Sequence, residues 1–334
     1  MELLRSVHFR RVLLVSLASS LALQPWSYRL LAADALDRPL RVILPFAPGS
    51  PGDIVLRAVA NRWQAQTGQR LLVDHRPGAG GTLGAGLALQ AAGDGSTLLF
   101  ATSDVLINNT ALVRGLHYDP QRDFRPIARI GPIPLVLCVP ADLPVADVAA
   151  FATWARTRRI AYGSWGEGSH AHILGAVLLA RVLELDAVHV AYGGLGPMLQ
   201  DLMKGQVAAG FAVPPAAAPL VAAGRLKALA VTGRQRSVAL PTVPTLAELG
   251  YAEPAFELLQ WAAFMAPARI ANARAAMLER ELGVALAHED TQRALQFAGF
   301  ESAQVAGPEE TRLQIARELA LVPPLIRELG VLPQ

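Results

Sequence analysis

The stretch Leu40-Arg41-Val42-Ile43-Leu44-Pro45-Phe46-Ala47-Pro48-Gly49-Ser50-Pro51-Gly52-Asp53 decides the fold of this chain. Its apolar first half predicts a short buried strand, and its run of glycine and proline predicts a turn. Asp53 then opens a predicted helix, because a carboxylate in the first turn stabilises the helix dipole. A strand that leads through a Gly-rich turn into a helix is typical of a parallel α/β sheet.

The same alternation of strand and helix returns along the chain and restarts after Pro140. The predicted strands that follow the first one cover residues 71–74, 98–102, 159–164, 187–192, 207–213 and 226–232. This pattern predicts an α/β protein with two lobes, each built on a parallel sheet. Long helices predicted from Ile270 onward need a partner, and the simplest arrangement returns the chain to the first lobe.

We therefore expect a hinge that the chain crosses twice, near residues 134–140 and 240–255. Lobe 1 would be discontinuous and would consist of residues 36–138 and 252–334. Lobe 2 would consist of residues 139–251. A length of 334 residues suits two domains of roughly 100–200 residues each.

The first 35 residues read as an export signal. Arg5, Arg10 and Arg11 precede the apolar run 12–23, and Ala33-Asp34-Ala35 offers a cleavage site. The apolar run is shorter than the ~20 residues that a membrane span needs. We predict a cleaved signal peptide at residues 1–35 and a mature chain in the periplasm, exported by either the Sec or the twin-arginine route.

Composition excludes several classes of protein. Only 17% of residues are charged and 52% are hydrophobic, as in a well-packed globular protein. Without residues 1–35, which hold four arginines and two acids, 26 basic residues face 25 acidic ones. Nucleic acid is therefore not an expected partner. The single cysteine, Cys138, excludes an intramolecular disulfide and a zinc site made of cysteines.

Three Gly/Ser-rich turns follow predicted strands and precede predicted helices, at residues 49–52, 164–169 and 193–196. Ligands of open α/β sheets bind at the carboxyl ends of the strands. Glycine lets backbone N–H groups approach a ligand closely, and a helix N-terminus carries partial positive charge. Such turns on two lobes predict a site for an anion that needs no basic side chain.

Signatures of catalysis are missing. The sequence has no G-x-S-x-G and no H-E-x-x-H, and we predict no catalytic residue, no metal and no cofactor. His170 and His172 are two residues apart, so they do not share a face of a helix. The run Gly166-x-Gly168-x-x-Ala171 fits the dinucleotide fingerprint, but Tyr192 instead of an acid ends the next strand. A nucleotide-binding enzyme stays the lesser alternative.

Four motifs carry a resemblance to a known family. They are Pro45-Phe46-x-Pro48-Gly49-x-x-x-Asp53, Arg76-Pro77-Gly78-Ala79-Gly80-Gly81, Tyr162-x-Ser164-x-Gly166-x-Gly168-Ser169-x-x-His172 and His189-Val190-x-Tyr192-x-Gly194. In this order, from Pro39 to the C-terminus, the chain resembles the Bug receptors, the substrate-binding proteins of tripartite tricarboxylate transporters.

The resemblance implies a two-lobed periplasmic binding protein of the type II-like, Venus-flytrap kind. It implies a small carboxylate ligand, either a di- or tricarboxylate or an aromatic acid, and membrane permease subunits as partners. It also implies a receptor and not an enzyme, and we expect a monomer. A sensory partner of a membrane kinase would have the same kind of site and is the first alternative. The predicted ligand-binding residues are Phe46, Ala47, Pro48, Gly49, Ser50, Asp53, Ser103, Ser164, Trp165, Gly168, Ser169, His172, Tyr192 and Gly194.

The chain departs from the family pattern at positions that bear on the ligand. Ser50 stands where a second glycine is usual, and Trp165 is unusually bulky beside Ser164. Ala212 occupies a position that is often Asp, so a plain carboxylate is favoured over an amino acid. Trp165 suggests stacking on an aromatic acid.

Overall fold

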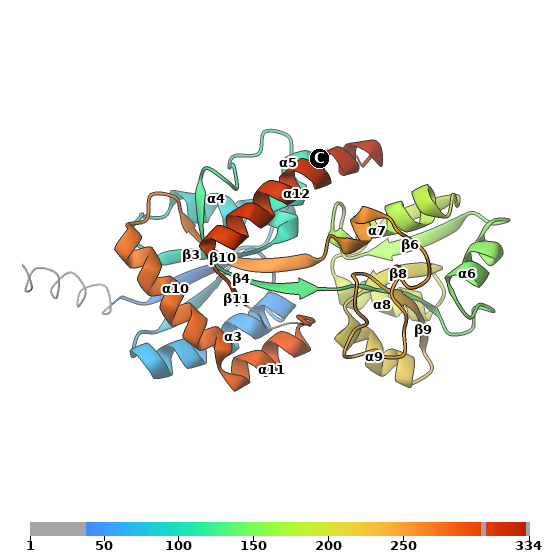
Figure 1. The fold of residues 1–334 in the computed structure, drawn as a ribbon, viewed down its shortest axis with the longest axis horizontal. Helices are drawn as coiled ribbons and strands as arrows, with labels where there is room; N and C mark the ends of the chain where they lie inside the picture. Colours follow the sequence, from blue (N-terminus) through green and yellow to red (C-terminus); the bar gives the residue numbers. More distant parts are fainter. Residues whose placement is uncertain (1–37, 302–304, 332–334) are drawn as a thin grey trace, which may run out of the picture.

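The computed structural model describes residues 38–301 and 305–331 of the chain. The predicted signal peptide therefore lies outside the described residues. Two lobes stand side by side, and extended segments run between them (Figure 1). Each lobe has one sheet covered by helices.

The sheet of lobe 1 has six strands in the order β11-β4-β10-β3-β1-β2. Its strands are β1 (Leu40–Leu44), β2 (Leu71–His75), β3 (Thr97–Thr102), β4 (Phe124–Ile133), β10 (Gln260–Pro267) and β11 (Val305–Ala306). Its helices are α3 (Pro51–Thr67), η1 (Ala79–Gly81), α4 (Thr82–Gln90), η2 (Asp104–Asn108), α5 (Asn109–Leu112), α10 (Asn272–Ala287), α11 (Glu289–Phe297) and α12 (Pro308–Glu328).

The sheet of lobe 2 has five strands in the order β7-β6-β8-β5-β9. Its strands are β5 (Val136–Pro140), β6 (Ile160–Ser164), β7 (Ala187–Ala191), β8 (Ala209–Ala212) and β9 (Leu226–Val231). Its helices are α6 (Val148–Ala155), α7 (His170–Gly175), η3 (Ala176–Val182), α8 (Leu195–Met203), α9 (Pro214–Ala222) and η4 (Pro254–Glu257).

The prediction of two α/β lobes joined by a hinge with two crossings is confirmed, and each sheet proves to be mixed. Among the described residues, hydrogen-bonded neighbouring strands are parallel only within the set β1, β2 and β3 of lobe 1 and the set β6, β7 and β8 of lobe 2. Strands β4 and β10 are antiparallel to their neighbours in lobe 1, as β5 and β9 are in lobe 2. The hinge is the cause. Strand β10 enters lobe 1 from lobe 2, and β5 enters lobe 2 from lobe 1. Each therefore runs opposite to the strands of its lobe that point toward the other lobe.

The two crossings fall at short segments. The first lies between Ile133, the last residue of β4, and Val136, the first residue of β5. The second lies just before β10, since the amide of Leu246 still binds the carbonyl of Val231 and that of Gly233 binds Phe256 in lobe 2. The lobe limits 36–138 with 252–334 and 139–251 stay a prediction. The first crossing lies just before residue 138, and the second lies after Glu257, further along the chain than residue 252.

Helices α9 and α12 each have a feature that was not predicted from the sequence. Residues 214–222 read Pro-Pro-Ala-Ala-Ala-Pro-Leu-Val-Ala, and we predicted no element there, yet they form α9. Proline at the first helical positions is tolerated because those N–H groups have no intrahelical acceptor. Helix α12 is fixed to the sheet by a buried contact in which Trp261 Nε1 donates to both oxygens of Glu318, at 2.8 and 2.9 Å.

Candidate ligand site between the two lobes

Strand direction brings the predicted ligand loops to face one another. Strand β10 enters lobe 1 from lobe 2, and β3 is antiparallel to it, so β1, β2 and β3 end on the side of lobe 2. By the same reasoning β5 enters lobe 2 from lobe 1, and β6, β7 and β8 end on the side of lobe 1. The loops after the parallel strands of both lobes therefore lie at the junction, where ligands of α/β sheets bind.

In lobe 1 the loop 46–50 is held by Asp53, a side chain in the first turn of α3. This side chain is 3% exposed, and its Oδ2 accepts the Gly49 N–H at 2.9 Å and the Arg57 Nε–H at 3.0 Å. His75, at the end of β2, contacts the other oxygen at 2.9 Å. Gly49 has a φ of +80°, a conformation that glycine adopts without strain. Asp53 thus fixes the shape of the loop instead of facing a ligand.

The charge of Asp53 is strongly favoured in this setting. Burial alone raises the pKa of a carboxyl, but the bonds from Gly49, Arg57 and His75 outweigh it and hold the pKa of Asp53 below its usual value. Asp53 is therefore a carboxylate at any ordinary pH. We predicted it as a ligand-binding residue, and the structure gives it three partners within its own lobe.

Two predicted serines lie at the helix starts that face lobe 2. Ser50 is the N-cap of α3, yet its side chain makes no capping bond, and its buried Oγ has no partner among the described residues. Ser103 is buried directly after β3, where η2 begins. A buried hydroxyl is normally hydrogen-bonded, so the unsatisfied Oγ of Ser50 is suited to a polar ligand or a water beside it.

In lobe 2 the loop 164–169 is held by two imidazoles. Ser164 Oγ lies 2.7 Å from His189 Nε2, 2.8 Å from the Gly166 carbonyl and 3.2 Å from the Gly166 amide. His172 Nδ1 accepts the Gly168 N–H at 3.0 Å. Ser169 caps α7 by accepting the His172 N–H at 3.3 Å. Sequence reasoning missed the role of His189, because nothing in a strand residue 25 positions away marks it as the partner of Ser164.

The same contacts decide which backbone N–H groups remain for a ligand. Those of Gly49, Gly166 and Gly168 are used inside the loops. In the described part of the chain, no acceptor is bound by the N–H groups of Phe46, Ala47, Trp165, Gly193 and Gly194. The glycines at positions 49, 166 and 168 thus shape the backbone, and the five N–H groups named above, two in lobe 1 and three in lobe 2, are among those left for a ligand.

Gly168 has a second role, because it touches lobe 1. Asn108 Nδ2 donates to its carbonyl at 3.0 Å. A Cβ at Gly168 would lie 2.0 Å from Leu112 Cδ1, and its φ is +67°. Both backbone polar groups of Gly168 are therefore occupied within the protein, and its position is one of contact between the lobes.

A polar contact between the lobes continues from Gly168. The backbone N–H of His170 lies against the Asp104 carboxylate, which also accepts from Gln260 Nε2 at 2.8 Å, and the buried Nε2 of the His170 ring has no partner among the described residues. Burial raises the pKa of Asp104 to about 7, although the bonds from His170 and Gln260 oppose this. Burial lowers the pKa of His170 to about 4. At this contact between the lobes, burial thus disfavours the charged forms of both Asp104 and His170.

The remaining predicted residues lie at the start of α8 and beside β6. The hydroxyl of Tyr192 donates to Asp201 at 3.2 Å, and its ring packs over Gly163, where a Cβ would lie 3.1 Å from it. Gly194 is the N-cap of α8. Trp165 is half-buried and packs against the core. Tyr192 therefore orders the turn, and Gly194 leaves the helix N-terminus open.

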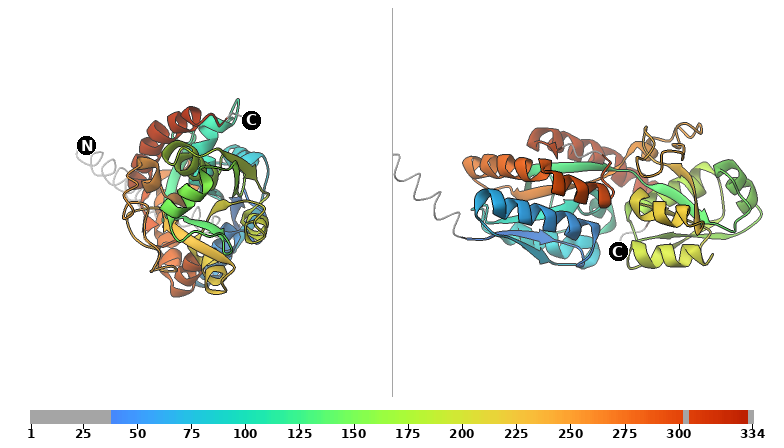
Figure 2. Two further views of the ribbon diagram at one scale, coloured as in Figure 1. Left: turned by 90° about the vertical axis from the view of Figure 1, so that its right-hand side faces the viewer. Right: turned by 90° about the horizontal axis from the view of Figure 1, so that it is seen from below.

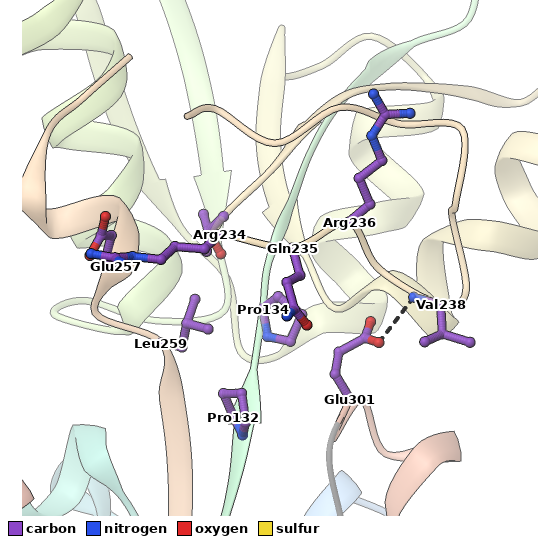
Figure 3. Close-up of a pocket in the computed structure, with 11 residues that line it drawn as sticks. Pro132, Pro134, Arg234, Gln235, Arg236, Val238, Glu257, Leu259 and Glu301 are labelled. Atoms are coloured by element: carbon purple, nitrogen blue, oxygen red, sulfur yellow. Dashed lines mark hydrogen bonds and ion pairs between the residues drawn. The ribbon is translucent and has the colours of Figure 1, made fainter. Parts of the chain in front are cut away.

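A hollow with a volume of about 350 Å³ lies beside the hinge and was not predicted (Figure 3). Pro132 and Pro134 of the first crossing and Leu259 of the second line it. Across it Glu301 of lobe 1 accepts the Val238 N–H at 3.0 Å and contacts the Ser237 hydroxyl. The 232–259 segment lies on the far side of the crossings from α3, α8 and α9 (Figure 2, right). Glu301 thus ties the lobes together behind the hinge.

The chain is similar to a family of solute receptors. The model of the tripartite tricarboxylate transporter family receptor matches residues 55–331. The protein BugT of Bordetella pertussis is 33% identical over 296 residues, which cover 88% of this chain and 90% of BugT.

Solved structures agree with this likeness. The R. palustris protein Rpa4515, solved with adipate, is 29% identical and has a TM-score of 0.79, over 89% of this chain and 99% of that one. MatC from Rhodopseudomonas palustris, solved with bound malate, is 28% identical with a TM-score of 0.74, over 86% of this chain and 99% of that one. None of the helices in residues 38–301 and 305–331 has the length and apolar character of a membrane span.

Proposed function

Since this chain belongs to the tripartite tricarboxylate transporter family of receptors, we propose that it captures a small carboxylate in the periplasm and delivers it to the membrane permease subunits of such a transporter. The family is one of solute-binding proteins and not of enzymes, so the alternative of a nucleotide-binding enzyme is set aside. Export through a cleaved signal peptide at residues 1–35 is part of the proposal.

One observation carries the proposal. Unused backbone donors of both lobes lie at the facing ends of the sheets, at Phe46 and Ala47 in lobe 1 and at Trp165, Gly193 and Gly194 in lobe 2. A carboxylate has two oxygens that accept several hydrogen bonds. It is held well by N–H groups at helix starts, without a basic side chain. A ligand that touches both lobes stabilises the closed form over the open one.

The structural relatives support a carboxylate as the ligand. Rpa4515 and MatC were solved with adipate and malate, both dicarboxylates. Ala212 ends β8 without a polar side chain, which leaves no acid there to pair with an amino group. We therefore propose a plain di- or tricarboxylate, or an aromatic acid stacked on Trp165, instead of an amino acid.

The experiment is a search for the ligand on the chain from residue 36 onward. Small molecules that co-purify are extracted for mass spectrometry, and adipate, malate and aromatic acids are screened by thermal shift. A ligand that binds only the folded state raises the melting temperature. At least one carboxylate should do so, and scattering should show a more compact molecule with it. A chain that comes empty and responds to no carboxylate would refute the proposal.

A pair of variants tests the donors themselves. Gly193→Pro removes one unused N–H, whereas Gly193→Ala keeps it, and a Cβ at this position meets nothing within 4 Å. The proline variant should lose about ten- to hundredfold in affinity for the carboxylate, which corresponds to the loss of one charge-assisted hydrogen bond of about 1.5–3 kcal/mol. The alanine variant should bind like the wild type. Equal affinities in all three proteins would remove Gly193 from the site.

A further inference from the structure

Three titratable side chains of lobe 2 lie close together at the loop 164–169, and the hydrogen bonds that shape this loop do not account for the one acid among them. Glu167, His172 and His189 each bring a ligand-type atom within 4.8 Å of the others. They line a hollow of about 560 Å³ between α7, β7 and the end of α12. The rings of His172 and His189 are stacked, with centroids 3.5 Å apart and planes at 6°.

Counting hydrogens fixes the tautomer of His189. Ser164 Oγ has one hydrogen but two neighbours that are potential acceptors, the Gly166 carbonyl at 2.8 Å and His189 Nε2 at 2.7 Å. A carbonyl has no hydrogen to give, so Ser164 donates to Gly166, and His189 Nε2 must donate to Ser164. In the neutral ring of His189, Nδ1 therefore carries a lone pair.

The same reasoning applies to His172. Its Nδ1 accepts the Gly168 N–H at 3.0 Å, so this atom also carries a lone pair. Glu167 Oε1 lies 3.3 Å from His172 Nδ1, and Glu167 Oε2 lies 3.3 Å from His189 Nδ1. With both rings neutral, a carboxylate faces two lone pairs and no hydrogen lies between them. The arrangement calls for one positive charge.

A proton on His189 meets this demand, and a metal ion does not. The lone pair of His172 Nδ1 is already spent on Gly168. Ring lone pairs lie in the ring plane, and two nearly parallel planes 3.5 Å apart do not point at one ion. A proton on His189 Nδ1 needs no rearrangement, because it donates directly to Glu167.

Other titratable groups around His189 do not compete for this role. Burial lowers the pKa of His172 to about 3, so it stays a neutral acceptor. Burial lowers the pKa of His189 below its usual value, and the neighbouring Glu167 offsets this only in part. The ring of Tyr162 on β6 lies 5.2 Å from that of His189 and stays un-ionised, since burial raises its pKa. Arg181 on η3 pairs with Glu328 at 3.3 Å and Glu253 at 3.9 Å.

We propose that Glu167 and His189 are positioning residues for the ligand loop of lobe 2, and that the loop binds a carboxylate more tightly when His189 carries its second proton. The protonated ring holds Ser164 through Nε2 and Glu167 through Nδ1, and thus both arms of the loop. It also adds a positive charge beside the donors that face the ligand. The inference rests on the proposed function and adds a pH dependence to it.

The test is the affinity for malate measured by calorimetry between about pH 7.5 and about pH 5, a range that reaches below the ordinary pKa of histidine because that of His189 is lowered. After correction for the ionisation of malate itself, the affinity of the wild type should rise about three- to tenfold toward the acid end. Glu167→Gln removes the partner, and His189→Gln keeps a donor for Ser164 but does not titrate. Both variants should bind malate with a nearly flat profile. His117→Gln, at an exposed histidine, is the matched control and should keep the slope.

A flat profile of the wild type, or a full slope in either variant, would overturn the inference. A separate readout works even where malate does not bind: ¹⁵N NMR of the rings should show His189 with a proton on Nε2 alone at neutral pH and on both nitrogens in acid. A ring that is protonated on Nδ1 alone would contradict it. Stoichiometric binding of Zn²⁺ that Glu167→Gln abolishes would replace the proton by a metal.

Discussion

The loops 46–50 and 164–169 face each other across the junction, and each is held in shape by buried side chains of a different kind. In lobe 1 a single buried carboxylate, Asp53, holds the loop 46–50 through Gly49 and is itself held by Arg57 and His75. In lobe 2 two imidazoles hold the loop 164–169, through Ser164 and Gly168. The first brace is charged and the second is neutral. The backbone of a binding loop is thus fixed by side chains from behind, which leaves its outward amides for a ligand.

The charged brace should have the largest effect when broken. Asp53→Ala leaves Arg57, His75 and the Gly49 N–H without their acceptor, so we expect the free energy of unfolding to fall by about 3 kcal/mol. Urea denaturation at neutral pH measures it, and Asp142→Ala, at an exposed loop position, is the control. Carboxylate affinity should fall as well, because the loop 46–50 loses its shape.

The pH dependence of this brace has a definite sign. The pKa of Asp53 is lowered in the folded protein, so its contribution is present above the ordinary carboxyl pKa and is lost as the pH falls below it. The difference in stability between wild type and Asp53→Ala should therefore shrink below about pH 4. A difference that stays constant down to about pH 3 would show that Asp53 acts through packing and not through charge.

His170, which directly follows the loop 164–169, should respond at a higher pH than Asp53 does. The pKa of His170 is lowered to about 4 by burial, so the folded state resists its protonation while the unfolded chain accepts it near the ordinary value. Stability from this source is present above about pH 6.5 and is lost as the pH falls toward 4. Between these limits the wild type should lose about 2 kcal/mol more than His170→Gln. Parallel curves for the two proteins would contradict a buried neutral histidine.

Sequence reasoning predicted the parts of this comparison that depend on local pattern. Alternating strands and helices identified the two lobes, and the Gly-rich turns identified the loops. The braces escaped prediction because they join residues far apart, as Ser164 and His189 do. The contact of Gly168 with lobe 1 escaped prediction for a related reason. A glycine in a turn suggests a backbone N–H that is free for a ligand, and only the folded chain shows that Leu112 of lobe 1 packs against this glycine.

Gly168→Ala tests this contact between the lobes and should have a smaller effect. A methyl group there would lie 2.0 Å from Leu112 Cδ1, and the φ of +67° disfavours any side chain. Because the end of a leucine side chain is able to move, we expect a loss of about 1–2 kcal/mol in the free energy of unfolding. Gly193→Ala, with open space around it, should cost only a few tenths. Equal losses at both positions would show that the lobes do not rest on Gly168.

The smallest effect is expected at Trp165, the bulkiest side chain of the loop 164–169. Trp165 follows the buried Ser164 and is half-buried itself, while its N–H has no acceptor in the described chain. If its ring stacks on an aromatic acid, Trp165→Ala should weaken binding of such an acid about threefold to tenfold, the worth of one aromatic contact. Binding of malate should not change, since an aliphatic acid has no ring to stack. Calorimetry with both ligands separates the two roles of this residue. Equal losses for both acids would mean that Trp165 supports the loop from behind, and an unchanged affinity for both would leave ligand selection to the backbone donors alone.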